Sequence, residues 1–148
     1  MTPDVSRFLE VASVHLLTRS LPAVGDAYEQ SALGALAVLL SVVREDFDRA
    51  AERRVAENAA LREIFAQAVD IVEDPALRGQ LEAAAGKGEP SLRVSDLERV
   101  NSELRALLIM LHAEVETLDG GAARDCEVRI WRELAASTER RRIAIGPF

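Results

Sequence analysis

Apolar residues recur at three- and four-residue steps along most of the chain, the spacing that places side chains on one face of an α-helix. The first such stretch predicts a helix over about residues 3–20, capped by Thr2 and interrupted by Pro22. The clearest stripe alternates three- and four-residue steps, as in the seam of a helical bundle. Its members are Leu97, Val100, Leu104, Leu107, Leu111, Val115 and Leu118.

The segment 28–72 carries two apolar stripes separated by a charged stretch, Arg49 to Asn58. No Gly or Pro lies between Glu45 and Glu73, so one very long helix is compatible with the sequence. Because helices in globular proteins average about 10–14 residues, we expect two helices hinged in the charged stretch.

Capping residues and glycines divide the rest of the chain. Asp74 and Pro75 predict the start of a short helix over 75–85, ended by the loop 86–90. Ser95 and Glu98 have the spacing of a capping box at the start of the seam helix, which Gly120 and Gly121 end. A last helix is expected over 122–142, and the apolar tail 143–148 should dock on the bundle or on a neighbour.

These elements predict an all-α fold, a four- to five-helix antiparallel bundle in which residues 1–148 form a single domain. The composition agrees, because 49% of the 148 residues are hydrophobic and only 4% are aromatic, and strong helix formers dominate. The regular seam and the apolar tail offer more apolar surface than one bundle can cover. We therefore expect a homodimer, or binding to a partner protein.

Charge and cysteine content exclude several classes of protein. A net charge of -7 argues against nucleic-acid binding, which needs many Lys and Arg residues to neutralise phosphates. The most apolar run, 32–43, is about half of the roughly 20 residues that span a bilayer, so we expect no membrane association. Cys126 is the only cysteine and no signal peptide is recognisable, which favours a reducing, cytoplasmic location.

The candidate ligand-binding residues are His15, His112, Glu116 and Trp131, which could reach into a cavity between helices. His112 and Glu116 are four residues apart and share a helix face, as two metal ligands or a base–carboxylate pair would. Two ligands do not make a site, and the Glu-x-x-His spacing of di-metal bundles does not occur. We therefore favour a histidine that borders the core and is oriented by Glu116, with no metal and no cofactor.

Other polar groups have competing interpretations. The pairs Glu45/Asp48 and Asp70/Glu73 resemble the magnesium-binding carboxylates of helical nucleotide hydrolases, and would converge only if the helix between them breaks. Cys126 is in register with Ile130, which favours burial over reactivity. The cations at 140–142 could bind an acidic partner or a phosphate, but we favour the interpretation that they complement the dipole of a helix C-terminus.

Two short stretches carry a resemblance to a known family. The run Ala35-Leu36-Ala37-Val38-Leu39 and the closing Arg142-Ile143-Ala144-Ile145-Gly146-Pro147 resemble short, uncharacterised bacterial helical proteins encoded beside aminoglycoside-phosphotransferase-like kinases and acyl-CoA dehydrogenases. The resemblance implies a helical architecture and an accessory role.

The sequence therefore favours a non-catalytic interaction, regulatory or accessory protein over an enzyme. The first alternative is a binder of a small molecule or acyl chain in a cavity of the bundle. The more remote alternative is a metal-dependent nucleotide hydrolase built on the two carboxylate pairs.

Overall fold

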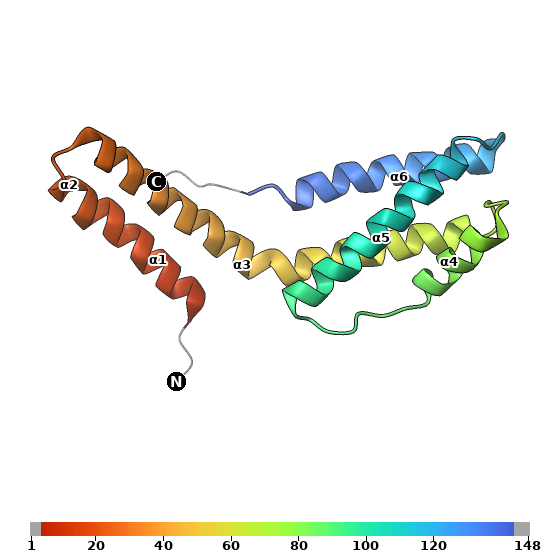
Figure 1. Ribbon diagram of the computed structural model, residues 1–148, viewed down its shortest axis with the longest axis horizontal. Helices are drawn as coiled ribbons and strands as arrows, with labels where there is room; N and C mark the ends of the chain where they lie inside the picture. Colours follow the sequence, from red (N-terminus) through yellow and green to blue (C-terminus); the bar gives the residue numbers. More distant parts are fainter. Residues whose placement is uncertain (1–3, 144–148) are drawn as a thin grey trace. The chain divides into compact units, whose positions relative to one another are not determined.

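The computed structural model describes residues 4–143, and within that range every regular element is helical (Figure 1). The all-α bundle predicted from the sequence is confirmed. In chain order the elements are α1 (Val5–His15), the π-helical η1 (Leu16–Ser20), α2 (Leu21–Ala23), α3 (Ala27–Ala68), α4 (Pro75–Ala85), α5 (Val94–Val115) and α6 (Gly121–Arg140). The predicted cap Thr2 and the tail 144–148 lie outside the described residues.

The first helix begins and continues differently from the prediction. Asp4 caps α1, its carboxylate accepting a hydrogen bond from the backbone N–H of Arg7 at 3.0 Å. Helical structure then continues through η1 and α2 to Ala23, past the expected end at residue 20. Pro22 lies in α2 directly after the π-helical η1, where the N–H of Leu21 bonds to the carbonyl of Leu16, and the helical run ends one residue beyond it at Ala23.

Long-range packing divides the described residues into two compact units, residues 4–50 with residue 143 and residues 51–142. In the first unit, α1 and the N-terminal part of α3 form an antiparallel hairpin whose contact is built from small residues. The hydroxyl of Ser13 donates to the carbonyl of Ala37 at 2.9 Å and lies 3.0 Å from the hydroxyl of Ser41. Small side chains let the two backbones approach closely, so the hairpin buries little apolar surface of its own.

The second unit contains the main hydrophobic core. It is formed by the C-terminal part of α3 together with α4, α5 and α6, and its largest fully buried apolar side chains are Phe65, Leu81, Leu97, Leu111 and Ile130. The predicted seam of α5 is confirmed in its register, with Leu108 buried more deeply than Leu107. The core therefore lies where the clearest apolar stripe predicts it.

The predicted break in the central segment is wrong. Helix α3 runs for 42 residues and passes through the charged stretch 49–58 without interruption. Its polar side chains there do not all face solvent, because Glu57 and Asn58 are fully buried in the second unit. Their hydrogen-bonded partners, described below, stabilise the helix at the point where average helix lengths favour a break.

The remaining boundaries test the predicted caps. Helix α4 spans 75–85 as predicted, and the carboxylate of Asp74 accepts a hydrogen bond from the N–H of Ala76 at 2.9 Å. The prediction of a capping box at Ser95 and Glu98 is wrong. Helix α5 begins at Val94, and its N-cap residue Arg93 makes no side-chain hydrogen bond. Glu98 pairs instead with Arg54 of α3. The last helix starts and ends within two residues of its predicted limits.

Candidate functional site

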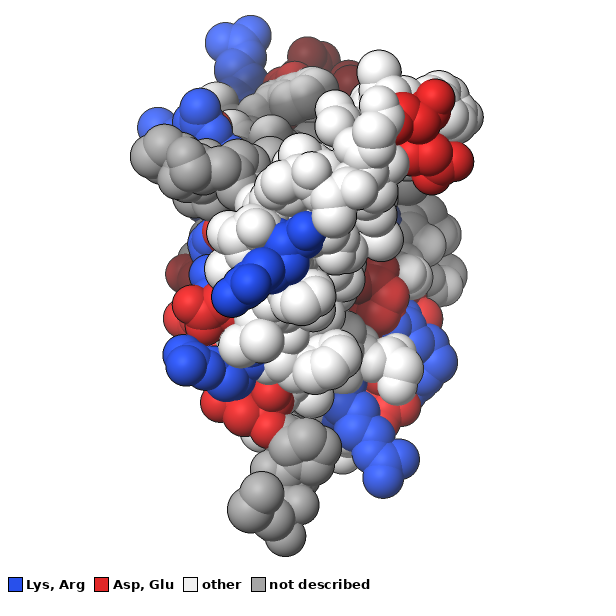
Figure 2. All heavy atoms as spheres, turned by 90° about the vertical axis from the view of Figure 1, so that its left-hand side faces the viewer, with Lys and Arg blue, Asp and Glu red and all other residues white. Residues whose placement is uncertain are grey.

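The most extensive candidate site is an exposed apolar surface on the hairpin of the first unit, here called the hairpin face. Its side chains come from α1, from the first turn of α3 and from the middle of that helix. Its large apolar members, each at least 42% exposed, are Val5, Phe8, Val11, Val14, Tyr28, Leu36, Leu39, Val43 and Phe47. Figure 2 views the side on which α1 and α2 lie in Figure 1, and residues other than Lys, Arg, Asp and Glu cover most of its middle, with one basic side chain across them. Large apolar side chains exposed in this number on one hairpin are typical of a protein-binding surface.

Charged residues of both signs border the hairpin face. Glu10 of α1 lies 3.6 Å from Arg7 on its own helix and 3.6 Å from Arg44 of α3. These exposed pairs contribute little to stability. They do balance charge along the edge of the face, so the surface does not repel a second surface of the same kind.

The second unit contains a buried polar network centred on Glu57, whose side chain is 1% exposed. One carboxylate oxygen accepts hydrogen bonds from the hydroxyl of Ser137 and the Nε of Arg141, both at 2.8 Å. The other accepts from a terminal nitrogen of Arg141 at 2.8 Å and from one of Arg54 at 3.1 Å. Helices α3 and α6 are thus joined by a bidentate arginine–carboxylate pair.

These partners determine the charge state of Glu57. Burial by itself raises the pKa of the carboxyl group. The hydrogen bonds from Arg141 and Ser137 and the charges of Arg141 and Arg54 outweigh burial and lower the pKa of Glu57 to about 2. The same pair raises the pKa of Arg141, chiefly through its hydrogen bonds to Glu57. The carboxylate is therefore ionised at neutral pH and held in place from several directions.

Helix α5 joins the same network through Asn101. The side-chain amide of Asn101 donates to Glu57 at 3.2 Å and to the side-chain oxygen of Asn58 at 2.9 Å. The amide of Asn58 in turn donates to the carbonyl of Leu97 at 3.3 Å. The network thus joins three helices. Because both carboxylate oxygens of Glu57 accept hydrogen bonds from the protein's own donors, neither is free to react with a substrate.

The four candidate residues from the sequence do not all meet. In the second unit, the Nε2 of His112 lies 3.6 Å from a carboxylate oxygen of Glu116. The His112 ring also meets the ring of Trp131 edge-on, with centroids 5.3 Å apart and an interplanar angle of 86°. His15 is instead an exposed residue at the end of α1, in the first unit. The structure also adds a residue that the sequence reasoning missed, Glu127 of α6, next to His112 and Glu116.

The cysteine lies in the core, and the C-terminal arginines form ion pairs within the chain. Cys126 is buried, and burial raises the pKa of its thiol against the opposing charge of Arg129, as expected for an inert core residue. The three arginines at 140–142 each pair with a glutamate of their own chain, namely Glu133, Glu57 and Glu139 respectively. The structure thus engages all three arginines in ion pairs within the chain.

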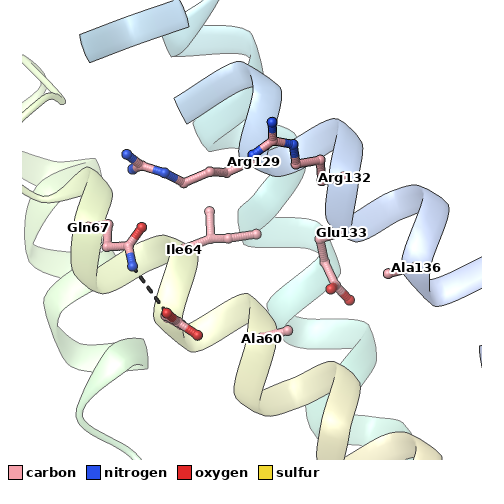
Figure 3. A pocket seen from close by; sticks show the side chains of 8 residues that line it. Ala60, Ile64, Gln67, Arg129, Arg132, Glu133 and Ala136 are labelled. Atoms are coloured by element: carbon pink, nitrogen blue, oxygen red, sulfur yellow. Dashed lines mark hydrogen bonds between the residues drawn. The ribbon is translucent and has the colours of Figure 1, made fainter. Parts of the chain in front are cut away.

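A groove between α3 and α6 has a volume of about 270 Å³ (Figure 3). Ala60, Ile64 and Ala136 give it an apolar part, and Arg129 extends over Ile64 from α6. None of the four candidate ligand-binding residues lines it. The groove is open to solvent and smaller than the roughly 300–1,000 Å³ typical of small-molecule sites, so it favours the ligand-binding alternative only weakly.

The carboxylate pairs of the hydrolase alternative lie in different units, Glu45 and Asp48 in the first and Asp70 and Glu73 in the second. The alternative requires a break near residue 54 that would fold the second pair back on the first. Helix α3 contains no such break.

Comparison with protein-family models, with curated proteins and with solved structures gives no match. Within residues 4–143, no helix is both long enough and apolar enough to cross a membrane. Inference about function therefore rests on the surfaces and side chains of this chain alone.

Proposed function

We propose that this protein is a non-catalytic, self-associating interaction protein, and that the hairpin face binds the same face of a second copy. The observation that carries the proposal is the number of large apolar side chains left exposed on α1 and α3, in a hairpin whose own helix contact is made of small residues. Two hairpins joined in this way form a four-helix bundle, the arrangement in which amphipathic helices commonly bury their apolar sides.

The energetics favour association. Burying the exposed half of a large apolar side chain contributes about 1 kcal/mol, so nine such residues on each of two copies contribute roughly 18 kcal/mol. Association costs an estimated 4–15 kcal/mol in lost translational and rotational freedom, before side-chain ordering is counted. The balance is favourable if most of the hairpin face is covered.

A second copy fits the face better than an unrelated partner would. In a two-fold symmetric dimer each surface binds itself, so an apolar face meets an equally apolar face. The bordering residues Arg7, Glu10 and Arg44 supply both signs of charge, which permits pairing across a symmetric interface.

The polar groups of the second unit support the non-catalytic part of the proposal. Glu57 is the most deeply buried carboxylate there, and it is fully engaged by Arg141, Ser137, Arg54 and Asn101. A general acid or base needs a proton that it can exchange with a substrate near neutral pH. A carboxylate with a pKa of about 2 and no free oxygen does not meet that need.

The resemblance noted from the sequence implies an accessory role, and we extend the proposal to that role. A cytoplasmic location belongs to the same proposal, since the single cysteine is buried and unpaired, as in proteins of reducing compartments.

The test is sedimentation equilibrium of the wild type and of a double variant, Leu39→Glu with Phe47→Glu. Both side chains are exposed in the single chain, at 57% and 55%, so the substitutions should leave the helices intact, as circular dichroism would verify. We expect a wild-type mass of twice 16.1 kDa and a dissociation constant at least about 100-fold weaker in the variant, because two charges would be buried at each interface.

The matched control is Leu92→Glu with Ile109→Glu, which places two charges at exposed apolar positions of the second unit, at 72% and 71% exposure. It should dimerise like the wild type. A wild type that is monomeric at about 100 μM would overturn the proposal, as would a double variant that dimerises normally.

A further inference from the structure

His112, Glu116 and Glu127 bring three metal-binding groups together where α5 ends and α6 begins. His112 lies on the last turn of α5, Glu116 caps its C-terminus and Glu127 lies in the second turn of α6. One donor atom from each of the three side chains lies within 4.8 Å of the other two. The i, i+4 pair fixes two ligands on one helix, and the packing of α6 adds the third.

The state of His112 is a second, independent observation. Its Nε2 atom is inaccessible to solvent and makes no hydrogen bond within the part of the chain that the structure describes. The nearest carboxylate oxygen, on Glu116, is 3.6 Å away, which is too long for a hydrogen bond. A buried ring nitrogen without a partner is unfavourable. Coordination to a cation between the three side chains would satisfy it.

The ring is also held in one orientation. Trp131 of α6 meets the imidazole edge-on, which restricts rotation of His112 without using its Nε2 atom. A positioned imidazole loses less freedom on binding a metal than an exposed one does. Glu116 is 58% exposed, so its side chain is free to adjust toward a bound ion.

The ligand chemistry indicates which ion fits. One neutral imidazole and two carboxylates neutralise a divalent cation, and imidazole selects Zn²⁺ and similar transition metals over Mg²⁺ or Ca²⁺. Zinc takes nitrogen and oxygen ligands at about 2.0–2.2 Å, which requires donors about 3.3 Å apart in a tetrahedron. The Glu116 oxygen, 3.6 Å from Nε2 of His112, is already near this spacing, and no pair of the three donor atoms would need to close by more than about 1.5 Å, a movement within the reach of a flexible side chain.

We propose that His112, Glu116 and Glu127 form a binding site for a divalent transition-metal ion of the Zn²⁺ class, which links the end of α5 to the start of α6. With three protein ligands, the fourth position of the ion is left to water or to an exogenous ligand. This inference is independent of dimerisation, because all three residues lie in the second unit and none belongs to the hairpin face.

The test uses ZnCl₂ and the full chain after treatment with a chelator. Trp131 is the only tryptophan and contacts His112, so its fluorescence should change on zinc binding and saturate at one ion per chain. Isothermal titration calorimetry provides a readout that does not depend on the fluorophore. Glu127→Gln should weaken binding at least about 10-fold, and His112→Gln should abolish it at micromolar zinc.

Two controls make the result specific. His15→Gln removes the other histidine, and Glu103→Gln removes an exposed carboxylate elsewhere on α5. Both should bind zinc like the wild type. The proposal is overturned if neither method detects binding at about 100 μM zinc, or if the Glu127 and His112 variants bind as tightly as the wild type.

Discussion

At the scale of the residue, Glu57 is the least expected feature of the protein. A glutamate within the charged stretch 49–58 looks solvent-exposed when the stretch is considered alone. Its burial depends on Ser137 and Arg141, which lie about 80 residues away in sequence and which no local pattern pairs with it. One feature of the sequence does indicate that Glu57 faces the core. Four- and three-residue steps from Ala50 through Arg54 and Glu57 to Leu61 continue the core-facing register of α3.

We expect Glu57→Gln to lower the free energy of unfolding by about 2–4 kcal/mol. The substitution keeps the shape of the side chain but leaves Arg141 and Arg54 without their buried counter-charge, and one side of a buried ion pair typically costs about 3–5 kcal/mol when removed. The lower value allows for the partial exposure of Arg141. Urea denaturation followed by circular dichroism measures the change.

Glu98→Gln is the matched control, because Glu98 also pairs with Arg54 but is half-exposed. Its effect should stay below about 1 kcal/mol. Equal effects of the two substitutions would show that the buried network does not contribute more than a surface pair.

The lowered pKa of Glu57 predicts a specific pH dependence. The folded-state pKa of about 2 lies below the ordinary value of 4.5, so ionised Glu57 stabilises the fold above pH 4.5, and this contribution is lost as the pH falls toward 2. The full contribution is on the order of 3 kcal/mol, since each pKa unit corresponds to about 1.4 kcal/mol. The stability difference between wild type and Glu57→Gln should therefore shrink by about 2 kcal/mol between pH 6 and pH 3.

Urea denaturation of both proteins between pH 6 and pH 3 measures this difference in the free energy of unfolding. The contributions of the other carboxylates are the same in both proteins and cancel in the difference. A difference that stays constant with pH would contradict the assignment of an ionised, stabilised Glu57.

At the scale of the element, sequence reasoning succeeded where a local signal determines the outcome. The Asp74–Pro75 cap starts α4 where predicted, because the cap and the first turn are adjacent in sequence. It failed at α3 and at the start of α5, where tertiary contacts decide. Arg54, Glu57 and Asn58 are stabilised by partners on other helices, and Glu98 contacts Arg54 and does not cap its own helix.

The continuity of α3 predicts a large effect of proline within the charged stretch. Ala56 is exposed in α3, so Ala56→Pro changes the helix backbone without removing a packed side chain. We expect a loss of about 3 kcal/mol or more in the free energy of unfolding, because proline removes a helical hydrogen bond and clashes with the preceding turn. Thermal and urea denaturation give the value.

Ala56→Ser at the same position should cost only about 0.5 kcal/mol, the difference in helix propensity. A proline variant within about 1 kcal/mol of the wild type would mean that the helix is broken there after all.

At the scale of the whole molecule, the sequence was sufficient for the fold class and for the seam of the core. Periodic apolar stripes determine which helix faces are buried, and the buried residues of α5 follow that prediction. The stripes do not reveal which apolar faces lack a partner within the chain. Only the structure shows that Phe8, Leu39 and Phe47 stay exposed while the small residues Ser13 and Ala37 form the hairpin contact.

The central claim is that the hairpin face is buried against a second copy, and hydrogen exchange of α1 tests it most directly. In Leu39→Glu with Phe47→Glu, α1 is unchanged and the substituted side chains are exposed in the single chain. At a protein concentration of about 50 μM, we predict that the amides of residues 5–15 exchange at least about 10-fold faster in the variant than in the wild type. The reason is that loss of the dimer leaves α1 in a hairpin of marginal stability. The amides of residues 97–115 should exchange at the same rate in both proteins. Equal exchange of α1 in the two proteins would contradict the claim.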